Sequence, residues 1–329
     1  MTTVKVDFHT HTRISDGVDP LYKLIENAYR TGITALAVTD HDTIDAFSSK
    51  NLDEEKGEDE VRCKEEESSG QRVTRFEWTV LQRDGPVYIY KGMEIIPGIE
   101  FSARMDYEGK MLELHILALY VDPLCIPPAV STYLDTISEA RINRVKEMAS
   151  KRGINYEENV LPFSRHSKTP TRLHLGRAIY EQGRVGKGKP YTDAFEAMRS
   201  EFPRGSKGYI TIAPRDVLLP AQQVLTMICE LNAVPVWAHP GYSEGGVSIE
   251  DIARTLHSWA DGKIFLEAYS RNLNPHECIA RAATARKLGI PVLFGSDYHG
   301  FPMKSALLGW EVEEVHYKML REKMREWCG

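Results

Sequence analysis

The chain has 329 residues and a formal net charge of −6, with 42% hydrophobic and 27% charged residues. These values are ordinary for a soluble globular protein and exclude disordered, collagen-like and coiled-coil classes, while the length allows one large domain or two ordinary ones. Because the acidic balance is mild, we expect no stable nucleic-acid complex, and an anionic substrate must be bound by a local site.

The distribution of apolar residues and cysteines favours a cytoplasmic protein without a membrane partner. No apolar run approaches the roughly 20 residues that cross a bilayer, and no basic-then-apolar signal opens the chain. The five cysteines are scattered without C-x-x-C spacing. We therefore expect neither a disulfide framework nor a thiolate zinc site.

The chain opens with a β-like run over residues 4–8, which is followed by His9 and His11. Because side chains alternate faces along a strand, the two imidazoles point the same way and can share one metal ion. An isolated H-x-H pattern often arises by accident, so its meaning depends on the rest of the chain. A polar loop carrying Asp16 comes next. The apolar spacing of the segment after it predicts a helix over residues 21–31.

Later strands repeat this arrangement of an apolar run with a ligand-type side chain in it or directly after it. The strand predicted over residues 33–38 is followed by His41. A buried Glu100 would be costly unless it were paired or bound to a cation. The other strands are predicted over residues 94–101, 111–121, 233–238, 263–268 and 290–294, and their ligand-type residues are Glu100, His115, His239, Asp297 and His299.

Two insertions interrupt the alternation of strands and helices. Residues 48–91 hold an acidic, solvated stretch over 50–71 and a β-hairpin around Asp84-Gly85. Residues 127–203 have helical periodicity and form a candidate cap between the barrel segments 1–126 and 204–329. Helices are expected over 129–151 and 172–183 in the cap, and over 222–231, 248–259 and 275–288 after it.

Among the basic residues of the cap, Arg172 and His174 are the candidates for binding a phosphate group. Thr169-Pro170-Thr171 is a suitable helix start, and it would place both side chains near a helix N-terminus, where anions are favoured. Most of the remaining basic residues in this segment fit a solvated helix face.

The alternation predicts an α/β fold in which seven strands form a barrel. In a β/α barrel the catalytic groups gather at the C-terminal rim of the strands, so residues far apart in the sequence meet at one mouth. Imidazole and carboxylate ligands suit manganese, iron or zinc. Two or three divalent ions about 3.5–4 Å apart would support phosphate hydrolysis. The candidate ligands are His9, His11, Asp16, His41, Glu100, His115, His239, Asp297 and His299.

The same stretches resemble those of the PHP (polymerase and histidinol phosphatase) superfamily of metal-dependent phosphoesterases. The resemblance implies a distorted (β/α)7 TIM-like barrel with a helical cap insertion. The matching stretches are Asp7-Phe8-His9-Thr10-His11, Ser15-Asp16-Gly17, Thr39-Asp40-His41-Asp42-Thr43, Gly98-Ile99-Glu100-Phe101-Ser102, His115, Ala238-His239-Pro240 and Gly295-Ser296-Asp297-Tyr298-His299.

The resemblance also implies how the ligands are shared among ions. One ion would be held by His9, His11, Glu100 and Asp297, a second by Glu100, His115 and His239, and a third by Asp16, His41 and His299. Asp16, where some relatives have histidine, and the segment Thr171-Arg172-Leu173-His174 resemble the nucleotide-phosphatase branch, which includes 3′,5′-bisphosphate nucleotidases and 5′-to-3′ exoribonucleases. In that branch the inserted arginine and histidine approach the substrate phosphate.

We therefore expect an enzyme that hydrolyses phosphomonoesters by a metal-bridging hydroxide. The substrates would be nucleoside monophosphates, 3′,5′-bisphosphates or the 5′ ends of short oligonucleotides. Glu100 would bridge the ions, and His239 or Asp297 would assist proton transfer to the leaving oxygen. The alternatives are a phosphatase for histidinol phosphate or another small metabolite, an amidohydrolase-like C–N hydrolase, and a metal-stabilised binding module without turnover.

Overall fold

The computed structural model describes residues 2–48, 82–183, 185–186, 189–203, 217–241, 247–271, 273–304 and 307–328. The acidic stretch predicted over 50–71 lies outside these residues. The strands are β1 Thr3–Asp7, β2 Ile33–Val38, β3 Gln82–Asp84, β4 Val87–Tyr90, β5 Met93–Tyr107, β6 Lys110–Leu119, β7 Val185–Gly186, β8 Lys189–Pro190, β9 Val234–Trp237, β10 Phe265–Ser270, β11 Val292–Gly295 and β12 Trp310–Glu313. The α-helices are α1 Leu21–Arg30, α3 Pro128–Lys151, α4 Leu161–Ser164, α5 Arg172–Glu181, α6 Ala194–Glu201, α7 Ala221–Glu230, α8 Ile249–Trp259, α9 Pro275–Leu288 and α10 Glu314–Trp327.

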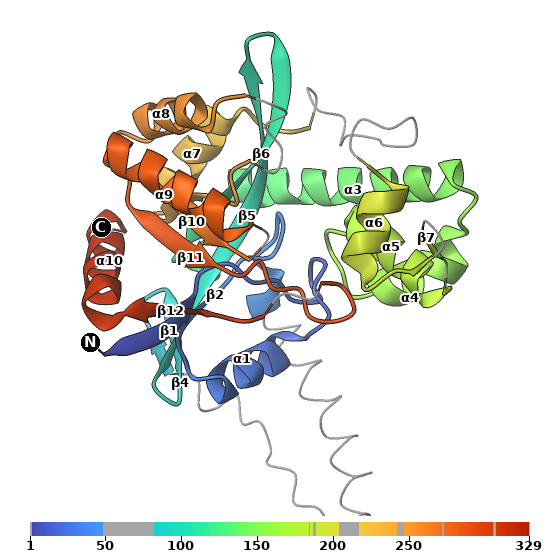
Figure 1. Ribbon diagram of the computed structural model, residues 1–329, viewed down its shortest axis with the longest axis horizontal. Helices are drawn as coiled ribbons and strands as arrows, with labels where there is room; N and C mark the ends of the chain where they lie inside the picture. Colours follow the sequence, from blue (N-terminus) through green and yellow to red (C-terminus); the bar gives the residue numbers. More distant parts are fainter. Residues whose placement is uncertain are drawn as a thin grey trace, which may run out of the picture.

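One sheet organises the molecule, with the strand order β11-β10-β9-β6-β5-β2-β1-β12 (Figure 1). The Phe8 amide donates to the Phe294 carbonyl at 3.0 Å, and the Asp297 amide donates to the His9 carbonyl at 2.9 Å. These bonds join the end of β1 to the end of β11, so the sheet is a nearly closed barrel. The prediction of a distorted α/β barrel is confirmed.

The distortion comes from strand direction. The neighbours β1, β2 and β5 are parallel, as are β9, β10 and β11. Strand β6 runs antiparallel to both β5 and β9. Strands β5 and β6 are joined by a hairpin that extends beyond the barrel, as Figure 1 shows. The parallel strands are nearly continuous apolar runs because helices and core cover both faces; all four residues of β9 are buried.

Two hydrophobic clusters hold the barrel together. One packs the sheet against the outer helices, with Ile25 of α1, Leu225 of α7 and Leu256 of α8 among its buried residues. The other includes Phe8 directly after β1, Phe265 of β10 and Met324 of α10. Burying a large apolar side chain contributes roughly 1.5–3 kcal/mol, so the two clusters fix the strand ends that carry the polar residues.

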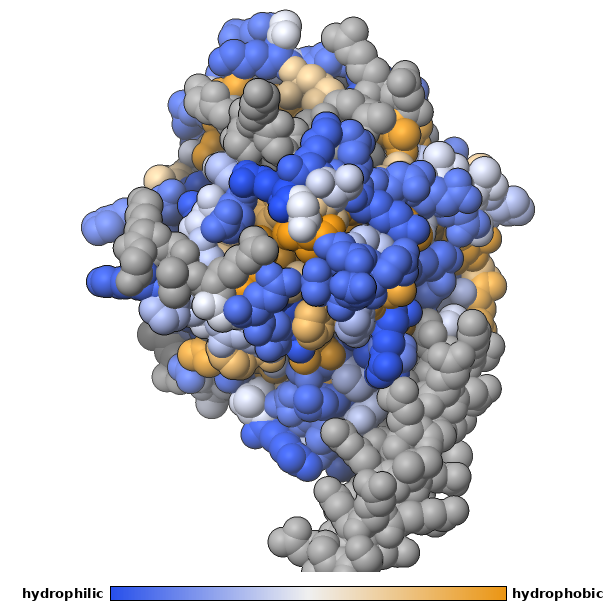
Figure 2. All heavy atoms as spheres, turned by 90° about the vertical axis from the view of Figure 1, so that its right-hand side faces the viewer, coloured by the Kyte–Doolittle hydropathy of each residue, from blue (hydrophilic) through white to orange (hydrophobic). Residues whose placement is uncertain are grey.

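The helices α3 to α6 form a separate layer to one side of the barrel (Figure 1). They share a cluster in which Met148 of α3, Ile179 of α5 and Ala197 of α6 are buried. Figure 2 shows the face over these helices, which is mainly hydrophilic with a small hydrophobic area near its middle. Among the described residues, no helix is long and apolar enough to span a membrane.

Most predicted elements match the structure within a few residues, and three differences stand out. Strand β5 extends to Tyr107 instead of ending at residue 101, because antiparallel pairing with β6 continues along the hairpin. Strand β12 and helix α10 were not predicted. The predicted hairpin around Asp84-Gly85 is present as β3 and β4, and the part of it before residue 82 lies outside the described residues.

Candidate metal centre

Glu100 lies within β5 at the centre of a cluster of histidines, and its side chain is fully buried. Its Oε1 is 2.7 Å from Nδ1 of His115 and 2.9 Å from Nε2 of His239. Its Oε2 is 3.3 Å from Nε2 of both His9 and His11. The two oxygens of one carboxylate therefore face two different groups of histidines, which is the arrangement of a bridging ligand.

The first group forms where β1 and β11 end side by side. Nε2 of His9 and Nε2 of His11 are 3.1 Å apart, so the two rings lie on one face of the chain. Asp297 follows β11, and its Oδ1 is 3.1 Å from Nε2 of His11 and 3.7 Å from Nε2 of His9.

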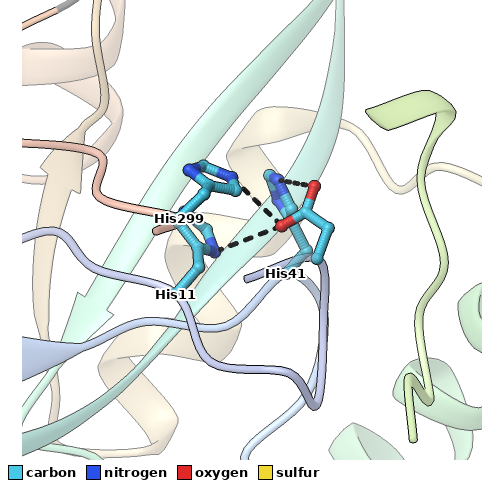
Figure 3. Close-up of side chains that lie close together, drawn as sticks. His11, His41 and His299 are labelled. Carbon is cyan, nitrogen blue, oxygen red and sulfur yellow. Dashed lines mark ion pairs between the residues drawn. The ribbon is translucent and has the colours of Figure 1, made fainter. Parts of the chain in front are cut away.

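A further group gathers around Asp16 in the first loop, and Figure 3 shows the rings of His11, His41 and His299 beside one another there. Asp16 Oδ1 is 3.1 Å from Nε2 of His299, and Asp16 Oδ2 is 3.6 Å from Nε2 of His41. His41 also turns its Nδ1 to Glu100 Oε2 at 2.8 Å. His41 thus connects the Asp16 group to Glu100, a link that the expected ligand sets did not contain.

The chemistry of these groups fits divalent cations. Nδ1 of His41 and Oε2 of Glu100 are buried and make no hydrogen bond with any described residue. Buried polar atoms normally have a partner, and a cation between these two would serve both. Among the described residues, ligand atoms within 4.8 Å of one another occur in three sets: His9, His11 and Glu100; His41, Glu100 and His115; and His11, Asp16, His41 and His299.

The electrostatics of the cluster keep the carboxylates ionised. Burial alone would raise the pKa of Glu100, but the imidazoles of His41 and His115 hold it well below its usual range. For Asp297, burial is likewise outweighed by Lys304 and His299, so its pKa is also well below the usual value. Burial and the neighbouring His299 lower the pKa of His11 to about 3, which leaves a neutral imidazole able to bind a metal ion.

Glu267 of β10 supports the cluster and was not predicted. Its Oε2 lies 3.0 Å from Nδ1 of His9 and accepts a hydrogen bond from the His239 amide at 2.7 Å. If His9 donates through Nδ1, its Nε2 is left free toward Glu100. A Cβ at Gly295 would lie 2.4 Å from Glu267 Oε1, so this close approach requires glycine. The signal that could have identified Glu267 is the one that identified Glu100, a lone carboxylate in an apolar strand.

Other carboxylates brace the loops behind the cluster. Asp40 accepts hydrogen bonds from the Thr12 amide at 2.8 Å and from the Ser15 hydroxyl at 2.5 Å, next to Asp16. Asp42 accepts from the Ser102 amide at 2.7 Å and from Nε of Arg141 at 2.8 Å. The two aspartates flank His41 in the sequence, but their side chains accept hydrogen bonds from the surrounding loops and from Arg141 and do not join the histidine cluster.

The backbone is strained at three of these positions. Asp42, His239 and Asp297 have φ angles of 47°, 28° and 52°. Such values are uncommon outside glycine and concentrate at functional sites, where the surrounding structure maintains them.

A pocket opens above the histidine cluster, and its lining combines ligand-type residues with cations. The ligand-type residues are Asp16, His41, His115, His239, Asp297 and His299, and the cations are Arg141, Arg144, Arg172 and Lys304. The helices α5 and α6 add an apolar side to it through Leu173, Phe195 and Met198.

The two predicted phosphate-binding residues are placed differently. Arg172, the first residue of α5, lines the pocket and donates from Nη1 to the Phe202 carbonyl at 2.9 Å. His174 is buried, and its Nδ1 accepts from the Thr171 amide at 3.2 Å in a capping box. The Thr171 hydroxyl in turn donates to Asp16 Oδ2 at 2.6 Å. The start of α5 is therefore bonded directly to the Asp16 group.

Comparison with known families decides the classification. A family model described as the PHP domain matches residues 7–159. Over this segment, a little under half of its length, the chain is similar to PHP domains. The match runs from the last residue of β1 through α3, and His239, Asp297 and His299 lie beyond it. The closing of the barrel brings these three residues to the matched segment.

Three relatives are similar to this chain over most of its length. A 5′-3′ exoribonuclease of Haemophilus influenzae is 23% identical, with 95% of this chain and 96% of the relative covered. A phosphoribosyl 1,2-cyclic phosphate 1,2-diphosphodiesterase of Eggerthella lenta is 24% identical over 89% and 94%. A 3′,5′-nucleoside bisphosphate phosphatase of Chromobacterium violaceum is 23% identical over 89% and 87%.

Two solved structures share the fold. A Bifidobacterium adolescentis protein classed as a metal-dependent phosphoesterase has a TM-score of 0.66 and 21% identity, with 97% of this chain and 96% of that chain covered. A Chromobacterium violaceum protein described as an amidohydrolase has a TM-score of 0.69 at the same identity and coverage.

Proposed function

We propose that this protein is a metal-dependent phosphoesterase that hydrolyses phosphomonoesters. The observation that carries the proposal is Glu100, whose oxygens face histidines on two sides while Oε2 has no hydrogen-bond partner among the described residues. Two or three divalent ions would be held as the family resemblance implies, with Glu100 shared between two of them. When bound, such ions lower the pKa of water and neutralise charge on phosphoryl oxygens.

The side chains around the ions have separate tasks in this proposal. Glu267 orients His9, and the Thr171 hydroxyl orients Asp16. Arg172, at the start of α5, binds a phosphate oxygen. His174 does not contact the phosphate; it accepts a hydrogen bond from the Thr171 amide and so holds Thr171 in place beside Asp16. His239 and Asp297 line the pocket and are the groups proposed to assist proton transfer to the leaving oxygen.

For the substrate we propose a nucleotide: a nucleoside monophosphate, a 3′,5′-bisphosphate or the 5′ end of a short oligonucleotide. The names of two relatives support this class. The apolar side of the pocket, formed by Leu173, Phe195 and Met198, suits a leaving group with a nonpolar ring. We also propose that residues 127–203 act as a cap over the barrel mouth, because α5 and α6 supply this side of the pocket.

A substrate panel tests the proposal. The protein is stripped with a chelator, reloaded with manganese, iron or zinc, and assayed with AMP, a 3′,5′-bisphosphate, a 5′-phosphorylated oligonucleotide, a 1,2-cyclic ribose phosphate, histidinol phosphate and a simple amide. We expect phosphate release that depends on added metal and is highest with a nucleotide. Release from histidinol phosphate or cleavage of the amide would favour the alternative enzymes.

Variants make the panel decisive. Glu100→Ala should lose at least about 100-fold in kcat, in line with the loss of transition-state electrostatic stabilisation. The exposed Glu230→Ala serves as a matched control that should behave like the wild type. Phosphatase activity that survives Glu100→Ala would rule out the proposed centre.

A further inference from the structure

Lys304 is a buried cation in the wall of the pocket, and no motif around it predicts a functional role. It lies in the loop that follows His299, only 6% of it is exposed, and it lines the pocket. Its ammonium group forms a short ion pair with Asp297 Oδ2. The same ammonium lies 4.7 Å from the centre of the Phe195 ring, on the cap helix α6.

The loop that carries Lys304 is fixed from both sides. The Lys304 amide donates to the Gly300 carbonyl at 3.0 Å, and the Ala194 amide at the start of α6 donates to the Pro302 carbonyl at 2.7 Å. Met303 is buried against Leu173 and Met198 of the cap. The side chain is therefore held in place before any ligand arrives, and a preorganised cation loses little freedom on binding.

The ammonium has a donor to spare. A lysine ammonium carries three N–H groups. Asp297 Oδ2 accepts one, and the Phe195 ring attracts the charge through its face without a conventional acceptor. The described residues supply no other side-chain acceptor to this nitrogen. At least one N–H is thus available on the pocket side, next to the carboxylate that faces His9 and His11.

We propose that Lys304 contacts the substrate, with its ammonium donating a hydrogen bond to a non-bridging oxygen of the phosphate ester. This inference rests on the proposed function, because it requires a phosphate beside Asp297. Arg172 approaches from α5 and Lys304 from the barrel loop, so the phosphate would be held by cations from both parts of the molecule. A point charge on a fixed stem is suited to such a contact, and the larger planar guanidinium of arginine is not equivalent.

The test measures phosphate binding as well as turnover. Lys304→Met, Lys304→Gln and Lys304→Arg are compared with the exposed Lys287→Met, which loses a surface ion pair on α9. Metal content per chain, melting temperature and the Kd of inorganic phosphate for the manganese-loaded protein are measured for each. Metal content separates a substrate contact from a mere support of Asp297.

We expect Lys304→Met and Lys304→Gln to retain their metal and to bind phosphate roughly 10- to 100-fold more weakly, the range of a charge-assisted hydrogen bond. Lys304→Arg should recover part of the loss, and Lys287→Met should match the wild type. The inference is overturned if either neutral variant folds, keeps its metal and binds phosphate within about twofold of the wild type, or if the loss of affinity only parallels a loss of metal.

The two proposals fail in different ways. A wild-type protein that binds phosphate through Lys304 but hydrolyses no ester in the panel would refute the proposed function and leave the contact in place. If Lys304→Met binds phosphate and hydrolyses phosphomonoesters as well as the wild type does, the contact is refuted and the proposed function remains.

Discussion

His174 has a measurable electrostatic signature at the scale of the single residue. Burial lowers its pKa from 6.5 to about 4, so the folded protein keeps a neutral ring that accepts a hydrogen bond from the Thr171 amide. Between these two pKa values the unfolded chain binds a proton at this position and the folded chain does not. The contribution of the neutral His174 ring to the free energy of unfolding is therefore fully present above pH 6.5, and it is lost as the pH falls toward 4.

Replacing His174 with glutamine tests this linkage. Glutamine at the third helical position retains a capping-box acceptor but does not titrate. We expect the wild type to lose about 3 kcal/mol more than His174→Gln between pH 6.5 and pH 4, from the cited pKa difference at 1.36 kcal/mol per pKa unit. Urea unfolding at several pH values, with a chelator present, measures the difference. Parallel pH profiles of the two proteins would contradict the buried neutral state.

The role of a site residue was predictable where the pattern of its own strand was enough to indicate it. The shared direction of His9 and His11 follows from alternation along one strand, and Glu100 from the cost of a carboxylate in an apolar run. Lys304 was missed because its meaning depends on contacts with Asp297 and Phe195, and the latter lies more than a hundred positions away. The separate placement of Arg172 and His174 depends on which side of α5 faces the pocket, and the helix start alone does not determine it.

At the scale of elements, the close packing of α5 against α6 decides where Phe195 and Arg172 lie. A Cβ at Gly176 would approach the Ala194 carbonyl oxygen to 2.2 Å and Cβ of Met198 to 2.7 Å. The two helices can be this close only because position 176 has no side chain. Since Ala194 also holds the loop that carries Lys304, a shift of α6 would move both sides of the pocket.

Gly176→Ala is expected to destabilise the protein by about 1–3 kcal/mol, the usual cost of an added methyl group in a packed core. It should also weaken phosphate binding without reducing metal content, because α5 and α6 would move while the histidine cluster stays. Gly153→Asn is the matched control, since a Cβ there meets nothing within 4 Å and asparagine tolerates its positive φ. An unchanged melting temperature for Gly176→Ala would show that the helices can separate freely.

The elements themselves were largely predictable, and the exceptions have physical reasons. The apolar spacing of helices α1, α7, α8 and α9 defines their extent, and the structure agrees within one or two residues. Side chains cap the N-termini of α8 and α9, whereas α1 and α7 each begin directly after a proline. Strand β12 is only four residues long, with two exposed glutamates, and its existence depends on pairing with β1. Helix α10 is mostly exposed and buries Tyr317, Leu320 and Met324 against the barrel.

At the scale of the whole molecule, barrel closure makes one centre out of residues from six separate segments. The strand order puts β1 beside β2, and backbone hydrogen bonds join the end of β1 to the end of β11. His9 and His11 therefore meet Asp297 across nearly the full length of the chain. The convergence was predictable from the rule that ligand-type residues follow barrel strands. The reversed direction of β6 was not, and it decides that His115 reaches Glu100 across an antiparallel pair.

Such a centre should link metal binding to the stability of the entire fold. It buries Asp16, Glu100 and Asp297 as ionised groups beside imidazoles that compete for the same protons. Ions that bind the folded barrel and not the unfolded chain stabilise it by about 2.7 kcal/mol at a hundredfold excess over Kd. At roughly 2–4 °C per kcal/mol for domains of 150–250 residues, chelation should lower the melting temperature by about 5 °C or more, and manganese should restore it.

In Glu100→Ala the metal-dependent shift in melting temperature should be largely lost, whereas Glu230→Ala should show the full shift. Differential scanning calorimetry with and without chelator measures both. Identical melting temperatures for the stripped and reloaded wild type would mean that the cluster holds no ion tightly enough to serve as the proposed centre.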